Sequence, residues 1–263
     1  MDDVLTLGMD VGSTTSKCLI LRSGAEIAAA ALIPAGTGTS GPRRALEEAL
    51  DKAGLKRADV AVVTATGYGR ATFPGADHTA SELSCHALGA HFLIPEARTV
   101  VDIGGQDAKA LRLNPEGKLV SFLMNDKCAA GTGRFLEVMA RVLEKEVSDL
   151  AEMDAQATGV VPISSTCTVF AESEVISQLA KGVSLPELVK GIHMSVAVRT
   201  ASLVRRLGVT APVVMTGGVA RNAGVVRALE KELDTPIRVP PLAQLAGALG
   251  AAIYGWEHVR EKR

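Results

Sequence analysis

One short sequence pattern occurs twice in this chain with the same internal spacing. In each copy an apolar stretch ends at an aspartate, a glycine-rich turn follows, and a second apolar stretch contains a lysine near its start. The matched pairs are Asp10 and Asp102, Gly12 and Gly104, Lys17 and Lys109, and Leu19 and Leu111. Because two copies are too few to build a stacked solenoid, the repeat predicts two related α/β domains.

The segments after each copy have the periodicity of regular elements. A third strand follows each copy, and amphipathic helices come next. One long helix is predicted to start at a capping box, Ser184 to Glu187, and to stop at Gly208. The predicted third strands cover 26–32 and 118–123, a later strand covers Val213–Thr216, and further helices cover 42–53, 133–143, 221–233 and about 244–259.

Composition restricts the class of protein. The 263 residues are 47% apolar, which is enough for the core of one large domain or two of ordinary size. Lys and Arg total 28 against 29 Asp and Glu, and 3% of residues are aromatic, so neither nucleic acid nor a membrane is an expected partner. The acidic start is unlike a signal peptide, and no apolar run reaches the roughly 18 residues of a membrane span. We therefore expect a cytoplasmic protein.

The repeated turns are suited to phosphate chemistry. Backbone N–H groups and the hydroxyls of Ser13, Thr14 and Thr15 can point at phosphate oxygens. An aspartate at the strand end can hold hydrated Mg²⁺ or orient an attacking water. A third glycine pair, Gly217-Gly218, follows a later strand and strengthens the interpretation, although no Walker motif occurs. Gln106 and Asp107 could each orient the hydrolytic water or serve as a cap.

Two of the four cysteines stand just ahead of predicted helices. Cys128 lies in Asn-Asp-Lys-Cys-Ala-Ala-Gly-Thr-Gly and Cys167 in Ser-Ser-Thr-Cys-Thr-Val-Phe-Ala-Glu. A tetrahedral zinc or a cubane iron–sulfur cluster needs four such ligands, and a two-fold dimer would supply the missing two. The alternative is that both are structural cysteines, since free cysteine is often buried. Cys18 and Cys85 are expected to be packing residues.

Taken together, these motifs resemble one family, the ATP-dependent activators of 2-hydroxyacyl-CoA dehydratases. This BadF/BadG/BcrA/BcrD-type ATPase family also contains the ATPase subunits of benzoyl-CoA reductases. The similarity extends from residue 7 to about residue 254, and the two cysteine segments are its most specific part. The segments that carry it are 10–14, 65–70, 82–87, 102–107, 125–135, 164–174 and 216–219.

The resemblance implies a fold and a division of the chain. The fold is the α/β arrangement of actin, Hsp70 and sugar kinases, in which two ribonuclease-H-like domains clamp ATP between them. Residues 1–93 would form the first domain, and residues 94–241 the second, which carries both cluster cysteines. Residues 242–263 would form a C-terminal helix that packs back on the first domain.

The resemblance also implies a function. The protein would be a homodimer with one 4Fe-4S cluster held by Cys128 and Cys167 of both subunits, and helix N–H groups would face the sulfurs. It would take one electron from ferredoxin or flavodoxin and hydrolyse ATP to pass that electron to the dehydratase. Asp10, Asp102 and Gln106 would be catalytic, with Mg²⁺. ATP or ADP would contact Gly12, Ser13, Thr14, Thr15, Ser16, Gly104, Gly105, Gln106, Asp107, Gly217, Gly218, Asn222 and Gln244.

Three other interpretations remain open at the level of sequence. Within the family, the chain could be the ATPase component of a benzoyl-CoA-reductase-like or other low-potential reductase. A small-molecule kinase of the same fold, with structural cysteines, would need a substrate-binding insertion, and none is evident in 263 residues. A zinc-bridged dimer would use the same two cysteines for assembly alone.

Overall fold

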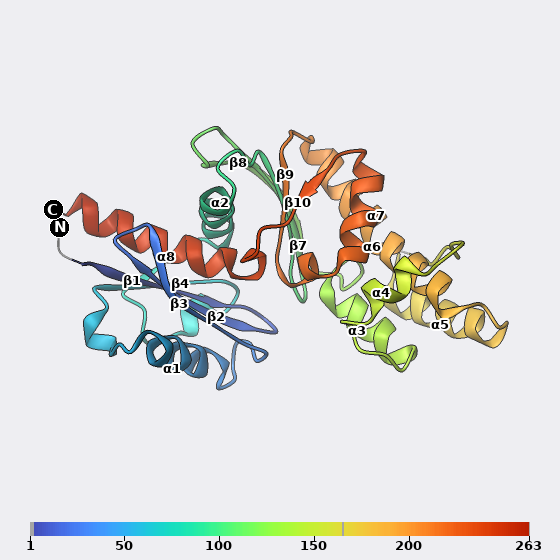
Figure 1. The fold of residues 1–263 in the computed structure, drawn as a ribbon, viewed down its shortest axis with the longest axis horizontal. Coiled ribbons are helices and arrows are strands. Elements are labelled where there is room, and N and C mark those ends of the chain that lie inside the picture. Colours follow the sequence, from blue (N-terminus) through green and yellow to red (C-terminus); the bar gives the residue numbers. More distant parts are fainter. Residues whose placement is uncertain (1–2, 165, 263) are drawn as a thin grey trace. The chain divides into compact units, whose positions relative to one another are not determined.

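A computed structural model describes residues 3–164 and 166–262. Ser165, which belongs to the second cysteine segment, lies outside these residues. The chain forms two compact units (Figure 1). Unit 1 comprises Met1–Ala97, Leu113–Leu119 and Gln244–Arg263, and unit 2 comprises Arg98–Arg112 and Val120–Ala243. The boundaries proposed from the sequence, 93/94 and 241/242, lie within a few residues of two of these limits.

The two sheets have the same topology. One has the order β3-β2-β1-β4-β5 and the other has the matching order β8-β7-β6-β9-β10. In each, the strand that ends at the repeated aspartate is central, antiparallel to the next strand and parallel to a later one. The prediction of two related α/β domains is thereby confirmed.

Unit 1 contains β1 to β5, α1, α2 and α8. Their bounds are β1 Leu5–Val11, β2 Ser16–Arg22, β3 Glu26–Ile33, α1 Gly41–Ala53, β4 Val62–Thr66, β5 His78–Thr79, α2 Glu82–Leu93 and α8 Ala246–Glu261. Figure 1 shows α1 and α8 on opposite faces of the sheet. The α1 face packs on the buried apolar side chains of β1 and β2, which alternate along each strand.

Glycine permits the close packing of α8. A Cβ on Gly8 of β1 would lie 1.8 Å from the carbonyl oxygen of Ala248, and a Cβ on Gly250 would lie 1.8 Å from that of Cys85. Such distances are far below van der Waals contact, so only glycine fits at these two positions. The small-residue composition of α8 therefore brings the helix directly against β1 and α2.

Unit 2 contains the remaining elements. Their bounds are β6 Thr99–Ile103, β7 Ala108–Leu113, β8 Leu119–Asn125, α3 Gly133–Val142, α4 Leu150–Ala155, α5 Thr168–Ala180, α6 Leu185–Leu207, β9 Val213–Thr216, α7 Ala223–Leu233 and β10 Ile237–Arg238. One continuous core joins the sheet to the apolar faces of α3, α6 and α7. The hairpin turn between β7 and β8 is grouped with unit 1.

The long helix α6 shows where local sequence signals hold and where they fail. It ends at Leu207, and Gly208 follows with φ +90°, so the predicted stop is confirmed. The predicted capping box is wrong, because the Ser184 side chain makes no cap hydrogen bond. Glu187 instead accepts a long hydrogen bond of 3.5 Å from the Thr158 hydroxyl. A tertiary contact thus replaces the local one.

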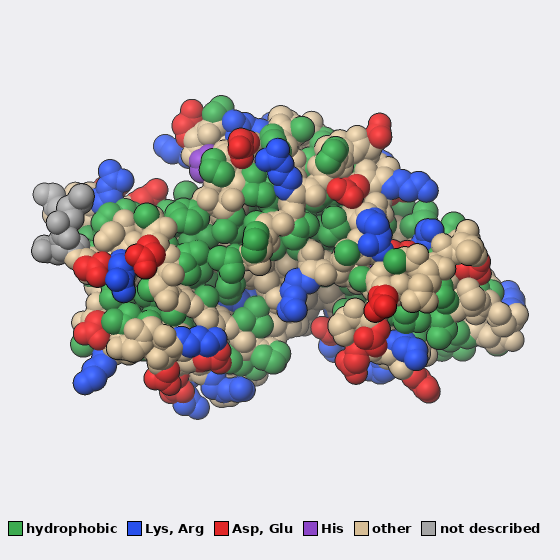
Figure 2. Space-filling view, in the orientation of Figure 1, with side chains coloured by type: hydrophobic (Ala, Val, Ile, Leu, Met, Phe, Trp, Pro, Cys, Tyr) green, Lys and Arg blue, Asp and Glu red, His purple; other side chains and the backbone are tan. Residues whose placement is uncertain are grey.

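Two properties of the molecular surface bear on function. Figure 2 shows acidic and basic side chains interspersed over the visible face. Among the described residues, no helix has both the length and the apolar character needed to cross a bilayer.

Candidate functional site

The first repeated turn holds its aspartate against a lysine of the next strand. Asp10 and Lys17 are register partners on β1 and β2, and Lys17 Nζ lies 3.1 Å from Asp10 Oδ2. The turn closes through the N–H of Gly12, which donates to the carbonyl oxygen of Thr15 at 3.0 Å. The carboxylate is almost fully buried, so the adjacent ammonium group compensates its charge.

The second turn repeats this arrangement in unit 2. Lys109 Nζ lies 3.3 Å from Asp102 Oδ2 and 2.7 Å from Asp107 Oδ2. The N–H of Gly104 donates to the carbonyl oxygen of Asp107 at 2.9 Å. Lys109 is 1% exposed and Asp102 is 2% exposed. Lys109 therefore forms a buried ion pair with Asp102.

Each of the two repeated aspartates also has a glycine packed near it, just after the end of a neighbouring strand. Gly217 has φ +86°, and a Cβ there would lie 2.3 Å from the Ile103 carbonyl oxygen. In unit 1, Gly67 has the same φ of +86°, and its Cβ would lie 2.4 Å from Asp10 Oδ1. The sequence predicts a nucleotide contact for Gly217, whereas no role was predicted for Gly67. The signal that could have found Gly67 is the Thr-Gly dipeptide at the ends of β4 and β9.

A threonine hydroxyl completes the second site. Thr216 Oγ1 donates to Asp102 Oδ1 at 2.8 Å, so both carboxylate oxygens of Asp102 have a partner. Sequence reasoning missed this role for Thr216. The buried carboxylate is fixed in orientation, which suits a group that must position a metal-bound or attacking water.

The predicted nucleotide contacts fall into two sets. Ser13, Thr14 and Thr15 are partly exposed on the first turn, and Gly104, Gly105, Gln106 and Asp107 form the second turn, with Gln106 exposed. Ser16, by contrast, is buried, and its hydroxyl donates to the Ala35 carbonyl oxygen at 2.7 Å. Ser16 therefore stabilises the end of the first turn by a hydrogen bond to the segment that follows β3.

Asn222 likewise has an internal role. Its Oδ1 accepts from the N–H groups of Gly224 and Val225, which caps α7, and its Nδ2 lies 3.1 Å from His193 Nε2. His193 Nδ1 lies 3.5 Å from Asp154 Oδ2, which also pairs with Arg227 at 2.8 Å. This buried network ties α4, α6 and α7 together. Gln244, the other predicted contact outside the turns, is partly exposed just before α8.

Residues 126–132, between β8 and α3, form the Cys128 loop, and the helix that follows this loop is hydrogen-bonded to the second turn. At the start of α3, the N–H of Gly133 donates to the Gly104 carbonyl oxygen at 2.9 Å, and the N–H of Arg134 donates to that of Gly105 at 2.8 Å. The prediction that N–H groups of this helix face the Cys128 sulfur is therefore wrong for these two groups. The helix begins five residues after Cys128, so its first N–H groups reach the turn instead.

Hydrogen bonds from Asn125, the last residue of β8, and from within the loop also hold the Cys128 loop in place. Asn125 Nδ2 donates to the Cys128 carbonyl oxygen at 2.9 Å, and Thr132 Oγ1 donates to that of Ala129 at 2.7 Å. Gly131 has φ +83°, a conformation that favours glycine. Short side chains at 129–131 keep the loop compact beside the partly exposed Cys128.

Cys167 sits directly at a helix start. It is the N-cap residue of α5, and its carbonyl oxygen accepts from the Ala171 N–H at 3.0 Å. The predicted helix start after Cys167 is confirmed. Cys167 is partly exposed, and the next two apolar residues, Val169 and Phe170, are 65% and 67% exposed.

The other two cysteines are packing residues, as expected. Cys18 and Cys85 are both fully buried. Burial raises the pKa of the Cys18 thiol strongly and raises the pKa of Cys85 to about 12. Since metals bind the thiolate, neither is a suitable ligand. Among the residues the structure describes, no group of three His, Cys, Asp or Glu could hold a metal. Each chain therefore has two thiols that a metal could reach, those of Cys128 and Cys167.

Comparison with known proteins identifies the family. The model of the BadF/BadG/BcrA/BcrD ATPase family matches residues 7–255. The activator of lactoyl-CoA dehydratase from Anaerotignum propionicum is 59% identical over 98% of this chain and 99% of its own length. The chain therefore belongs to the BadF/BadG/BcrA/BcrD ATPase family.

Solved structures agree with the assignment. An activator of 2-hydroxyisocaproyl-CoA dehydratase from Clostridium difficile, solved with bound ADPNP, superimposes with a TM-score of 0.96 at 55% identity, over 98% of this chain and 97% of that one. A ROK family glucokinase from Streptomyces griseus gives a TM-score of 0.60 at 14% identity, over 96% and 99% of the two chains. The second likeness shows the fold alone.

Proposed function

We propose that this ATPase activates a 2-hydroxyacyl-CoA dehydratase by delivering one low-potential electron to it at the expense of ATP. The observation that carries the proposal is the pair of hydrogen bonds between the start of α3, which directly follows the Cys128 loop, and the turn at Gly104. They connect a turn suited to phosphate to the helix that follows the thiol-bearing loop. The names of the highly similar relatives support a dehydratase as the partner.

Nucleotide binding is assigned to the two repeated turns and the Gly217 junction. Backbone N–H groups of the turns would bind phosphate oxygens, and Gly217-Gly218 would lie against the adenosine. Asp10 and Asp102 would hold hydrated Mg²⁺ or orient the attacking water, with Gln106 or Asp107 nearby on the second turn. Lys17 and Lys109 form ion pairs with these two carboxylates and fix their positions. The ADPNP bound to the Clostridium difficile activator supports this assignment.

The cysteines fit an iron–sulfur cluster shared by two subunits. Cys128 and Cys167 are partly exposed, whereas Cys18 and Cys85 are buried with raised pKa values. Two thiolates from each subunit would hold one 4Fe-4S cluster per homodimer. When bound, the cluster supplies one-electron transfer at low potential. Reduced ferredoxin or flavodoxin would be the donor, and the protein would act in the cytoplasm.

The chain's own residues would couple nucleotide to the cysteine loop. A change at the second turn on ATP binding or hydrolysis reaches α3 through the carbonyl oxygens of Gly104 and Gly105. Asn125 then links the loop to the end of β8. ATP can shift this assembly only by binding one arrangement more tightly than another.

Reconstitution tests the function. The anaerobic protein would be mixed with a 2-hydroxyacyl-CoA dehydratase, a one-electron reductant and MgATP, and the dehydration of lactoyl-CoA and 2-hydroxyisocaproyl-CoA would be followed. Activation should require ATP and should be lost with ADP alone. ATP hydrolysis without activation of a dehydratase, but with activation of a benzoyl-CoA-type reductase, would place the chain in the other branch of the family.

A further inference from the structure

A second short motif occurs twice in this chain, and its two copies lie at corresponding places in the two units. Ala-Gly-Thr-Gly stands at 35–38, after β3, and again at 130–133, after β8. β3 and β8 are the edge strands at the same end of the two matching sheets. The first copy contains none of the residues predicted to bind nucleotide or metal, so its role is open.

In each unit, a residue of the motif donates a backbone hydrogen bond to the phosphate turn of that unit. In unit 1 the N–H of Thr37 donates to the Gly12 carbonyl oxygen at 2.9 Å. In unit 2 the N–H of Gly133 donates to the Gly104 carbonyl oxygen, also at 2.9 Å. Gly12 and Gly104 are matched residues of the two turns. The two copies of the motif therefore hold the same peptide group of each turn.

These hydrogen bonds determine where the next N–H group of each turn points. The peptide bond between Gly12 and Ser13 is trans, so its carbonyl and its N–H point in opposite directions. Because the Gly12 carbonyl faces the motif, the Ser13 N–H faces the other side of the turn, where Ser13 is partly exposed. The bond to Gly104 orients the Gly105 N–H in the same way. An N–H group fixed in advance can bind an anion without reorganisation.

The first copy also packs closely on its turn. A Cβ on Gly36 would lie 2.2 Å from the Ser13 carbonyl oxygen and 2.7 Å from that of Gly12. Both oxygens belong to the backbone of the turn, so any other residue at position 36 must displace the turn. The Thr39 hydroxyl donates to the Gly36 carbonyl oxygen at 2.7 Å and holds this residue in place. Gly38, in the same motif, has open space around it.

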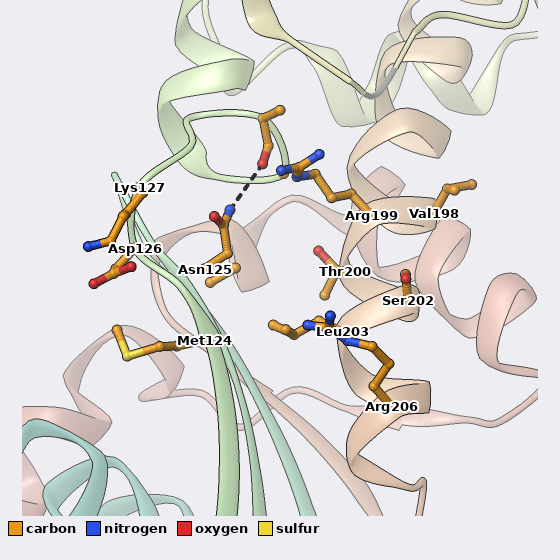
Figure 3. Close-up of a pocket in the computed structure, with 13 residues that line it drawn as sticks. Met124, Asn125, Asp126, Lys127, Val198, Arg199, Thr200, Ser202, Leu203 and Arg206 are labelled. Carbon is orange, nitrogen blue, oxygen red and sulfur yellow. Dashed lines mark hydrogen bonds between the residues drawn. The ribbon is translucent and has the colours of Figure 1, made fainter.

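A side chain at the end of a strand anchors the first residue of each copy. In unit 1 the Ser16 hydroxyl donates to the Ala35 carbonyl oxygen at 2.7 Å. In unit 2 the side-chain amide of Asn125 donates to the Ala130 carbonyl oxygen at 3.4 Å, which is the dashed line in Figure 3. The two copies thus share their anchor as well as their bond to the turn.

We propose that Gly36 and Thr37 are positioning residues of the nucleotide site. They fix the peptide group between Gly12 and Ser13, so that the Ser13 N–H donates to a phosphate oxygen of the bound nucleotide. This role rests on the proposed function, which places a nucleotide phosphate at the first turn. The segment after β3 then does for the first turn what the start of α3 does for the second.

Calorimetry on the intact protein with ADP and with adenosine tests the proposal, because only ADP has phosphates that the Ser13 N–H could bind. Gly36→Ala should weaken ADP about tenfold or more and leave adenosine within about twofold. Thr39→Val should weaken ADP severalfold, whereas Thr39→Ser, which keeps the hydroxyl, should bind ADP like the parent. Gly38→Asn is the matched control, because it has open space and asparagine tolerates its φ of +75°. It should leave ADP affinity within about twofold.

Unchanged ADP affinity in Gly36→Ala would overturn the proposal. So would an equal loss of adenosine affinity, which indicates general damage to the fold, or a Thr39→Ser variant as weak as Thr39→Val. Gly104→Val, measured in parallel, separates this role from the proposed function. ADP binding that is lost in Gly104→Val but kept in Gly36→Ala would overturn only the role of Gly36 and Thr37, whereas a parent protein that binds no ADP would overturn both.

Discussion

The backbone N–H of Gly133 donates to the carbonyl oxygen of Gly104 at 2.9 Å. Gly104 lies on the second repeated turn, and Gly133 is the first residue of α3, five residues after Cys128. Arg134 makes the adjacent bond to Gly105. A displacement of the turn by nucleotide would therefore be transmitted to α3 through the backbone, with no flexible side chain between them.

Substitution of Gly104 should separate nucleotide binding from cluster assembly. A Cβ at this position would lie 2.3 Å from Asp107 Oδ1, so Gly104→Val must displace that side chain from the turn. We expect ADP affinity to fall about tenfold or more, measured by calorimetry, with normal iron and sulfide content. Gly182→Asn is the control, because Gly182 has open space around it and asparagine tolerates its φ of +78°. Unchanged ADP affinity in Gly104→Val would count against the assigned turn.

Thr216 should matter for stability and for ATP hydrolysis. Thr216→Val keeps the shape of the side chain but removes the donor to Asp102 Oδ1. A buried acceptor without its donor costs about 1–3 kcal/mol, so the midpoint of thermal unfolding should fall and the ATPase rate should fall with it. Thr210→Val, at an exposed position, should change neither. Equal stability of the two variants would contradict the assigned hydrogen bond.

The four cysteines should divide into two pairs. Cys128→Ser or Cys167→Ser should abolish the iron–sulfur absorption, because each change removes two of the four ligands from a dimer. Cys18→Ser should keep the absorption, since burial raises the pKa of that thiol far above neutrality. Normal iron and sulfide content in either of the first two variants would defeat the shared-cluster model, and zinc in place of iron would support a purely structural bridge.

The buried Asp154 network should make stability depend on pH in acid. Burial acts to raise the pKa of Asp154, but hydrogen bonds from His193 and Arg227 outweigh it and lower the pKa below 3.8. Such a group stabilises the fold above its unfolded pKa, and this contribution is lost as the pH falls through the folded pKa. Urea unfolding should show Asp154→Asn less stable than the parent at pH 7, with a difference that shrinks below pH 3.8. A difference that does not change with pH would exclude the linkage.

The repeated pattern predicted the fold well because a few adjacent residues determine the same strand–turn–strand hairpin in both halves of the chain. An aspartate at the end of an apolar strand, followed by a glycine turn, requires the same hairpin in both halves, and both halves form it. The Gly208 helix end was predictable for the same reason, since a single residue type favours that backbone conformation. Features of this kind are properties of a few adjacent residues.

Features that depend on distant partners were not predictable from the sequence. Ser16 has the residue type of a phosphate contact, but its hydroxyl donates to Ala35 on the segment after β3. Asn222 stands next to the glycine pair, yet it caps α7 and contacts His193 on α6. In both cases a nearby polar group from another segment satisfies the side chain, and no sequence spacing reveals which segment lies there.

The bond from Gly104 to Gly133 predicts that nucleotide state controls access to the cluster, and the rate of iron removal tests this claim most directly. Under anaerobic conditions a chelator would be added to the protein with ADP and then with a non-hydrolysed ATP analogue, and the cluster absorption would be followed. Iron loss should be faster with the ATP analogue, and Gly104→Val should reduce the difference. Identical rates with both nucleotides, together with unchanged cluster spectra, would contradict coupling through α3.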